Sequence, residues 1–140
     1  RYIEANRFLR KLHPDIVEDT EHRIADLGGC VKRDPATDIL AINGEFSVSI
    51  VLARCQTSLS GRNRWKVRFD TSLLPDVTVA VRLDQQNTAP MDYYLLPHLD
   101  FSRQRINLAE RNPAEFESYR FDTLDYLYGM AARAKLRRAA

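Results

Sequence analysis

Residues 38–56 read DILAINGEFSVSIVLARCQ, and this stretch decides the fold. Two runs of mostly apolar residues flank Asn43-Gly44, a dipeptide that favours the positive φ angles of a two-residue hairpin turn. In the second run, apolar residues fill the even positions from Phe46 to Leu52, and serines stand at positions 47 and 49. This period of two is typical of a strand with one buried face. The stretch therefore predicts an antiparallel hairpin with strands over 38–42 and 45–56.

Further strands are predicted downstream and just upstream of this hairpin. They follow from the same alternation, bounded by turn residues. The predicted strands cover 30–33, 64–69, 77–83 and 93–97, with a possible short one near 106–108. Because the apolar residues of each strand share one parity, we expect an antiparallel meander with one covered face and one polar face.

Helices are predicted on both sides of these strands. Residues 1–12 carry apolar side chains at three- and four-residue spacing, and Pro14 separates this helix from a second one over 14–27. Asp122 is a suitable N-cap for a third helix over 123–138. The expected fold class is α/β (α+β), an antiparallel-rich mixed sheet of five to six strands packed by N- and C-terminal helices.

Length and composition restrict the class of protein. The chain has 140 residues, of which 44% are hydrophobic and 29% charged, enough for one domain with its own core. We expect a single domain over 1–140 that is a piece of a larger protein, since the sequence starts with Arg1. No apolar stretch is long enough for a membrane span or a signal peptide, so the expected location is the cytoplasm. Neither the two cysteines nor the three histidines have metal-ligand spacing, so we expect no metal and no cofactor.

The hairpin and the helices before it resemble the core of the restriction-endonuclease-like, or PD-(D/E)XK, nucleases over about residues 14–97. That family places an Asp at the start of one hairpin strand and an acid-x-Lys pair on the next, where carboxylate oxygens hold Mg²⁺. Asp38 matches the first position. The second motif departs from the pattern, because the aligned positions hold Ser49 and Val51.

The resemblance implies a non-catalytic, nuclease-like module that binds DNA or positions a partner within a nucleic-acid-processing protein, of the mobile-element or defence type. A first alternative is a Mg²⁺-dependent nuclease with a rearranged site, in which Asp38 and Glu45 bind the ion and Arg54 assists. A second alternative is a protein-interaction or oligomerisation domain with an exposed aromatic surface. That surface would draw on Tyr93, Tyr94, Tyr119, Tyr126 and Tyr128.

Two basic clusters are candidates for nucleic-acid binding. They comprise Arg62, Arg64, Lys66 and Arg68 in one strand, and Arg133, Lys135, Arg137 and Arg138 in the last helix. Without the four cations of the last helix, the formal net charge of +2 becomes −2, so the basic excess is local. Alternatively, the strand presents a solvated face, and the helix cations complement the helix dipole. The parity of Trp65 places it in the core. Expected partners are DNA, another protein or a second copy, and not a membrane.

The stretch from Asp92 to Asp100 is a third candidate feature. His98 and Asp100 could line a pocket and take part in acid–base chemistry or metal binding. The competing interpretation is a buried strand whose tyrosine hydroxyls find local hydrogen-bond partners.

Overall fold

The computed structural model describes residues 2–70, 72–101 and 103–139, so the predicted start of the first helix at Arg1 lies outside the described residues. Two helices precede a run of consecutive strands, and the remaining elements follow, in the order α1 (Ile3–Leu12), α2 (Pro14–Asp26), β1 (Val31–Arg33), β2 (Leu40–Ile42), β3 (Phe46–Ala53), β4 (Cys55–Thr57), β5 (Asn63–Arg68), β6 (Val77–Leu83), β7 (Pro90–Pro97), β8 (Arg105–Leu108), α3 (Ala114–Glu117), β9 (Arg120–Phe121) and α4 (Leu127–Ala139).

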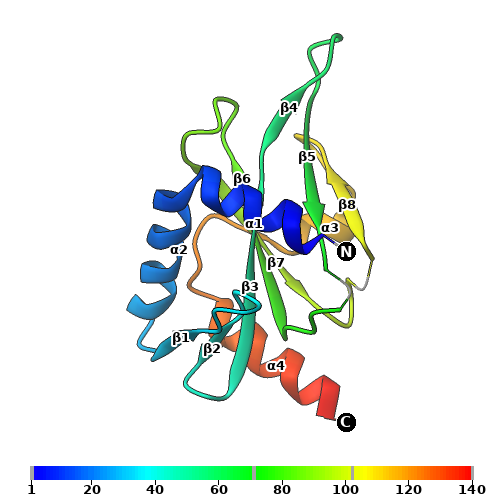
Figure 1. Ribbon diagram of the computed structural model, residues 1–140. Coiled ribbons are helices and arrows are strands. Elements are labelled where there is room, and N and C mark those ends of the chain that lie inside the picture. The colour runs from blue at the N-terminus through cyan, green and yellow to red at the C-terminus, as the bar shows by residue number, and fades with distance from the viewer. Residues whose placement is uncertain (1, 71, 102, 140) are drawn as a thin grey trace.

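The main sheet has six strands in the order β1-β2-β3-β6-β7-β9 (Figure 1). The β2–β3 hairpin turns at Asn43 and Gly44, whose φ angles are 57° and 67°, which confirms the predicted turn. All neighbouring strands are antiparallel except β3 and β6, which are parallel. The fold class is confirmed as a mixed α+β sheet, but the prediction of a purely antiparallel meander is wrong at this central pair.

A second, three-stranded sheet explains the parallel pair. Its order is β4-β5-β8, and it is antiparallel throughout. The predicted strand over 45–56 is broken at Arg54, where the chain leaves the main sheet and enters the second one. It returns only at β6, which can then lie beside β3 in the same direction. Both hairpin strands are also shorter than predicted. Strand β2 begins after Asp38, and strand β3 begins after Glu45.

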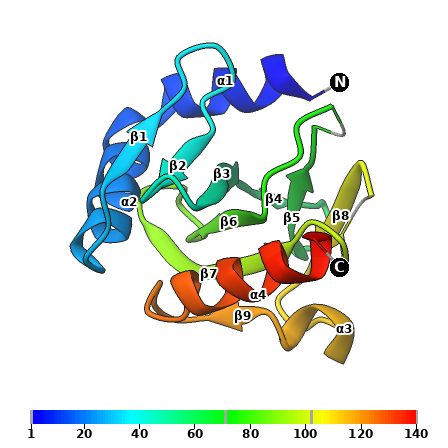
Figure 2. The ribbon, with the colours of Figure 1, turned by 90° about the horizontal axis from the view of Figure 1, so that it is seen from below.

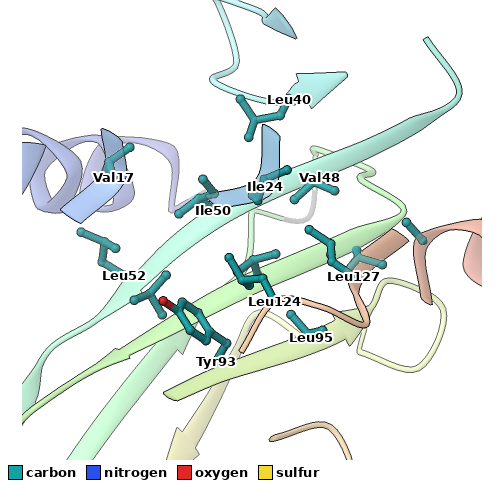
Figure 3. Close-up of a cluster of buried hydrophobic side chains, with 14 of the residues drawn as sticks. Val17, Ile24, Leu40, Val48, Ile50, Leu52, Tyr93, Leu95, Leu124 and Leu127 are labelled. Carbon is teal, nitrogen blue, oxygen red and sulfur yellow. The ribbon is translucent and has the colours of Figure 1, made fainter. Parts of the chain in front are cut away.

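One face of the main sheet packs against α2 and α4. Buried side chains from β3, β6 and β7 meet Val17 and Ile24 of α2 and Leu127 of α4 (Figure 3). The predicted even-numbered apolar positions of β3 all point into this core, although Phe46 is only partly buried. Helix α4 begins at Leu127 rather than at Thr123, so Asp122 does not cap it.

The opposite face is covered as well, and here the predicted polar face is wrong. The second sheet packs Trp65, Val67 and Leu108 against it in a separate core. All seven residues of β6 are consequently buried, including Thr78 and Arg82. Among the described residues, no helix is both long and apolar enough to cross a membrane.

Helix α1 lies along an edge of the main sheet, with α4 on the other side of β3, β6 and β7 (Figure 2). The pairing of β2 with β3 stops at Val48, which leaves the rest of β3 without a neighbour on that side. Arg10 of α1 donates from Nη1 to the carbonyl of Ile50 at 3.1 Å, and Asn6 donates from Nδ2 to the carbonyl of Arg68 in β5 at 3.0 Å. Helix α1 therefore connects the two sheets.

Candidate nucleic-acid interface

Asp38, the residue that matches the nuclease motif, lies in the loop before β2 with a φ of 61°. Its Oδ2 accepts a hydrogen bond from Nη2 of Arg10 at 3.0 Å and lies 3.5 Å from Nε of Arg7. The Arg10 guanidinium is held in place by its second hydrogen bond, to the Ile50 carbonyl. Two fixed cations from α1 therefore neutralise this carboxylate.

The two motif positions on β3 lie next to this ion pair. Ser49 and Val51 line a cavity of about 20 Å³ together with Arg10, which is room for roughly one water molecule. Asp70 lines the same cavity, but its Oδ1 already accepts two hydrogen bonds from Ser72. Mg²⁺ requires near-octahedral oxygen ligands and keeps several waters. The residues present do not fit the Mg²⁺ ion that the resemblance implies.

Glu45 lies at the other end of the hairpin from Asp38. Asp38 lies near Ile50, because Arg10 is hydrogen-bonded both to the Asp38 carboxylate and to the Ile50 carbonyl, and Ile50 is about 17 Å along the strand from Glu45. Glu45 is exposed in the turn, and its carbonyl accepts a hydrogen bond from Lys135 of α4. The structure therefore does not bring Asp38 and Glu45 together. Across the described residues, no three His, Cys, Asp or Glu side chains are grouped so that they could hold a metal ion.

The outer face of the second sheet carries the predicted basic strand. Arg64, Lys66 and Arg68 point to this side of β5, because alternate residues of a strand share a face. Trp65 points the other way and is buried, as predicted. On β8, Arg105 pairs with Arg68 and adds a fourth cation. We call Arg64, Lys66, Arg68 and Arg105 the basic face.

The charges of the basic face are free. In the part of the chain that the structure describes, none of its four cations forms an ion pair. Its uncharged neighbours are polar and exposed: Asn107 opposite Lys66, and Gln56 opposite Arg64. Such an arrangement keeps a local positive potential that is not cancelled from within the protein.

A groove of about 390 Å³ lies beside the basic face. Lys66 and Arg68 line it together with Arg54, and α1 forms the other wall with the exposed ring of Phe8. Arg54 also acts on the nearby helix junction: burial is the main cause of the lowered pKa of His13, and the positive charge of Arg54 lowers that pKa further. Arg54 thus adds a positive charge to the groove between the basic face and α1.

The cations of α4 are placed differently. Arg137 donates two hydrogen bonds to the carboxylate of Asp100, at 2.7 and 2.9 Å, and this pairing holds the pKa of Asp100 below its usual value. Arg138 lies 2.7 Å from Oδ1 of Asp76, and Lys135 donates to the Glu45 carbonyl. Arg133 is exposed at the start of this series. The last helix therefore uses three of its four predicted cations to attach itself to the sheet.

The stretch from Asp92 to Pro97 is buried in β7, whereas residues 98–100 lie in the turn that follows. Asp92 pairs with Arg82, and the Tyr94 hydroxyl accepts a hydrogen bond from Nδ2 of Asn112 at 3.1 Å. Burial raises the pKa of Tyr94 to about 12. Burial, and secondarily the charge of Arg138, lowers the pKa of His98, whose side chain is half-buried. The buried strand is thus confirmed for Asp92 to Pro97, while His98 lines the cavity of about 20 Å³ beside Ser49 and Asp100 is paired with Arg137 elsewhere.

The five tyrosines of the interaction-domain alternative do not form one exposed surface. Tyr93 and Tyr94 are buried, Tyr119 and Tyr128 are partly buried, and Tyr126 is exposed. The hydroxyl of Tyr128 is itself used within the fold, where it donates to the carbonyl of Ile24.

Two residues of this region were not predicted from the sequence: Arg105 of the basic face and Phe8 of the groove beside it. Arg105 could have been found, because Arg105 and Asn107 alternate with Ile106 and Leu108 in a pattern that places the cation outward. Phe8 reads as a core residue in the helical pattern of α1, and nothing in the sequence shows that it faces the groove.

Fold and surface together define an α+β protein with a six-stranded mixed sheet and a second sheet whose outer face is basic. No family model matches the chain, and no curated protein matches it. Among solved structures, the chain is similar in fold to a bacterial homing endonuclease, I-Ssp6803I. The similarity has a TM-score of 0.57, covers 92% of this chain and 96% of that chain, and comes with 18% sequence identity. The chain therefore shares the overall fold of this endonuclease.

Proposed function

We propose that this chain is a non-catalytic module of the PD-(D/E)XK type that binds double-stranded DNA, within a nucleic-acid-processing protein of the mobile-element or defence type. The observation that carries the proposal is the basic face, whose four cations are unpaired among the described residues. The similarity to a homing endonuclease supports DNA as the ligand.

The spacing of the basic face suits a phosphate backbone. Arg64, Lys66 and Arg68 are spread over about 13 Å of strand, and a DNA duplex advances roughly 3.4 Å per base pair. The row can thus follow about four base pairs. Each cation that neutralises a phosphate releases counterions, so binding through this face depends steeply on salt.

The surroundings of Asp38 support the non-catalytic part of the proposal. A metal-dependent nuclease needs carboxylates free to bind the ion and a path for water to the phosphate. Asp38 is instead paired with Arg10 and Arg7, and the two motif positions on β3 hold Ser49 and Val51. The positive charge next to Asp38 is therefore supplied by Arg10 of α1 and not by a residue at the motif positions of β3.

Charge reversal tests DNA binding. We expect Arg64→Glu, Lys66→Glu and Arg68→Glu together to weaken binding to a 20-base-pair duplex more than about tenfold at low salt. The matched control reverses three exposed cations outside the basic face, at Lys11, Lys32 and Arg111, and so makes the same change in net charge. Equal losses in the two triple variants, or wild-type binding that is insensitive to salt, would overturn the proposal.

Plasmid cleavage tests the absence of catalysis. We expect supercoiled plasmid to remain intact when it is incubated with the wild-type protein and Mg²⁺ or Mn²⁺. Cleavage by the wild type that Asp38→Ala abolishes would establish the metal-dependent alternative instead.

A further inference from the structure

The loop that joins β4 to β5 projects from the body of the protein (Figure 1). β8 pairs with β5 only up to Trp65, so beyond this residue the sheet is reduced to the two strands of one hairpin. We call residues 58–62 the hairpin tip. From Trp65 to Arg62, the last residue with a hydrogen bond across the hairpin, the hairpin extends by roughly 10 Å at about 3.4 Å per residue.

The hairpin tip is held in one shape by its own hydrogen bonds. The amide of Ser58 donates to the carbonyl of Arg62 at 2.9 Å, and the amide of Gly61 donates to the carbonyl of Ser58 at 2.9 Å. The side chains of Ser58 and Ser60 are hydrogen-bonded at 2.8 Å, and Gly61 takes a φ of 82°, which a glycine adopts without strain. Hydrogen bonds within residues 58–62 therefore define the shape of the tip.

The base of the hairpin is braced by two asparagines. Asn87 of the β6–β7 loop donates to the carbonyl of Cys55 and accepts from its amide. The buried Asn63 accepts from Thr57 and donates to Glu110 at 2.8 Å. Asn63 shares the parity of Trp65, so Glu110 lies on the side opposite the basic face. The hairpin is thus fixed to the body, and its acidic neighbour lies away from the basic face.

Two side chains of the hairpin tip have no partner in the structure. Leu59 is fully exposed at the end of the hairpin, where its apolar side chain is available to a ligand. Arg62 is exposed and forms no ion pair with any described residue. A leucine can contact the methyl group of thymine, and an arginine can donate two hydrogen bonds to O6 and N7 of guanine.

We infer that the β4–β5 hairpin enters the major groove of duplex DNA, where Leu59 and Arg62 read base edges and determine sequence specificity, while the basic face holds the phosphates. The inference rests on the proposed function. The major groove is about 12 Å wide and 8.5 Å deep and admits a two-stranded β-ribbon, so the projecting part of the hairpin is long enough to reach its floor. The basic face begins at Arg64, directly behind the tip, where the groove edges and their phosphates would lie.

Selection from a duplex library with a randomised centre tests the inference. We expect the wild type to enrich a short consensus, and Leu59→Ala or Arg62→Ala to lose the preference at two to three adjacent base pairs. Binding of Leu59→Ala to unselected genomic duplex, and the salt dependence of that binding, should stay unchanged because no charge is removed. Arg62→Ala removes one cation, so its binding to unselected duplex should fall no more than that of Lys66→Ala. Lys66→Ala is the matched control: it should weaken binding to all sequences alike and reduce the salt slope by about 1.

Modified bases make the test specific to the two contacts. In the selected duplex, replacing thymine by uracil removes the methyl group, and replacing guanine by 7-deazaguanine removes the N7 acceptor. We expect the guanine change to weaken wild-type binding roughly 5- to 100-fold and Arg62→Ala hardly at all, and the uracil change to affect the wild type but not Leu59→Ala.

The outcomes separate the two claims. Salt-dependent duplex binding without any consensus, or the same consensus in all variants, would overturn the inference and leave the proposed function standing. No binding of any duplex by the wild type would overturn both.

Discussion

Arg10 and Asp38 form an ion pair whose side chains are only 15% and 22% exposed. Removing the guanidinium leaves a poorly solvated carboxylate without its main partner. We therefore expect Arg10→Met, which keeps most of the apolar stem, to lower the free energy of unfolding in urea by about 1–3 kcal/mol. Arg7→Met is the matched control, because Arg7 is 42% exposed and 3.5 Å from Asp38, and it should cost less.

A double variant separates charge from packing at this pair. Adding Asp38→Asn to Arg10→Met removes the unpaired charge and should restore part of the lost stability. Losses that simply add in the double variant would contradict the account of Arg10 as the cation that neutralises Asp38.

Arg82 is the residue at which sequence reasoning failed most clearly. Strand alternation places it on a polar face, but the second sheet covers that face and buries it. Burial is tolerated because Asp92 lies opposite it in the register and accepts two hydrogen bonds, while the rings of Trp65 and Tyr94 face the guanidinium at 4.7 and 5.3 Å. None of these partners is a sequence neighbour of Arg82, so no local pattern could have identified the pair.

The buried pair yields a second prediction. Arg82→Met leaves Asp92 buried, with the guanidinium of Arg120 at 3.6 Å as its remaining cation among the described residues, and should lower the free energy of unfolding by about 3–5 kcal/mol. Arg82→Met combined with Asp92→Leu replaces both charges and should unfold at higher urea concentration than the single variant. A single variant as stable as the wild type would contradict the burial of this pair.

At the scale of elements, local patterns predicted the hairpin and the inward parity of β3 and β5, because turn chemistry and alternation are local properties. They did not predict the break at Arg54 or the parallel pairing of β3 with β6. Both depend on a second sheet that forms from β4, β5 and the distant β8. The packing of the second sheet against the main sheet also determines that the basic face points outward.

Two histidines should make the free energy of unfolding depend on pH: His13, between α1 and α2, and His98, directly after β7. Burial lowers the pKa of His13 and of His98, so the unfolded chain binds more protons than the folded one near and below pH 6.5. The contribution of the two neutral histidines to the free energy of unfolding is complete above pH 6.5. It is lost as the pH falls from 6.5 toward the pKa values of these histidines in the folded protein. We expect the melting temperature to drop between pH 7.5 and pH 5.5.

Histidine variants identify the source of this pH dependence. His13→Gln with His98→Gln should flatten the change in melting temperature between pH 7.5 and pH 5.5. His22→Gln, at an exposed position of α2, is the control and should leave it as in the wild type. A pH dependence unaffected by the double variant would assign it to other groups.

At the scale of the whole molecule, the two predicted basic clusters have different fates. The cations of α4 meet Asp76 and Asp100, which lie far away in sequence, and they attach the last helix to the sheet. The cations of β5 meet no acid among the described residues, because the facing positions on β4 and β8 hold Gln56, Asn107 and Arg105. Composition alone shows both clusters as equal candidates, and only the fold distinguishes the free charges from the paired ones.

The salt dependence of duplex binding tests the central claim most directly. The logarithm of the binding constant is measured against the logarithm of salt concentration for the wild type and for the neutralised variant Arg64→Gln/Lys66→Gln/Arg68→Gln. Since each lost phosphate contact reduces the slope by about 0.9 on B-DNA, we predict a slope smaller by about 2 to 3. The control Lys11→Gln/Lys32→Gln/Arg111→Gln should keep the wild-type slope. An unchanged slope in the first variant, or an equal fall in the control, would contradict the account.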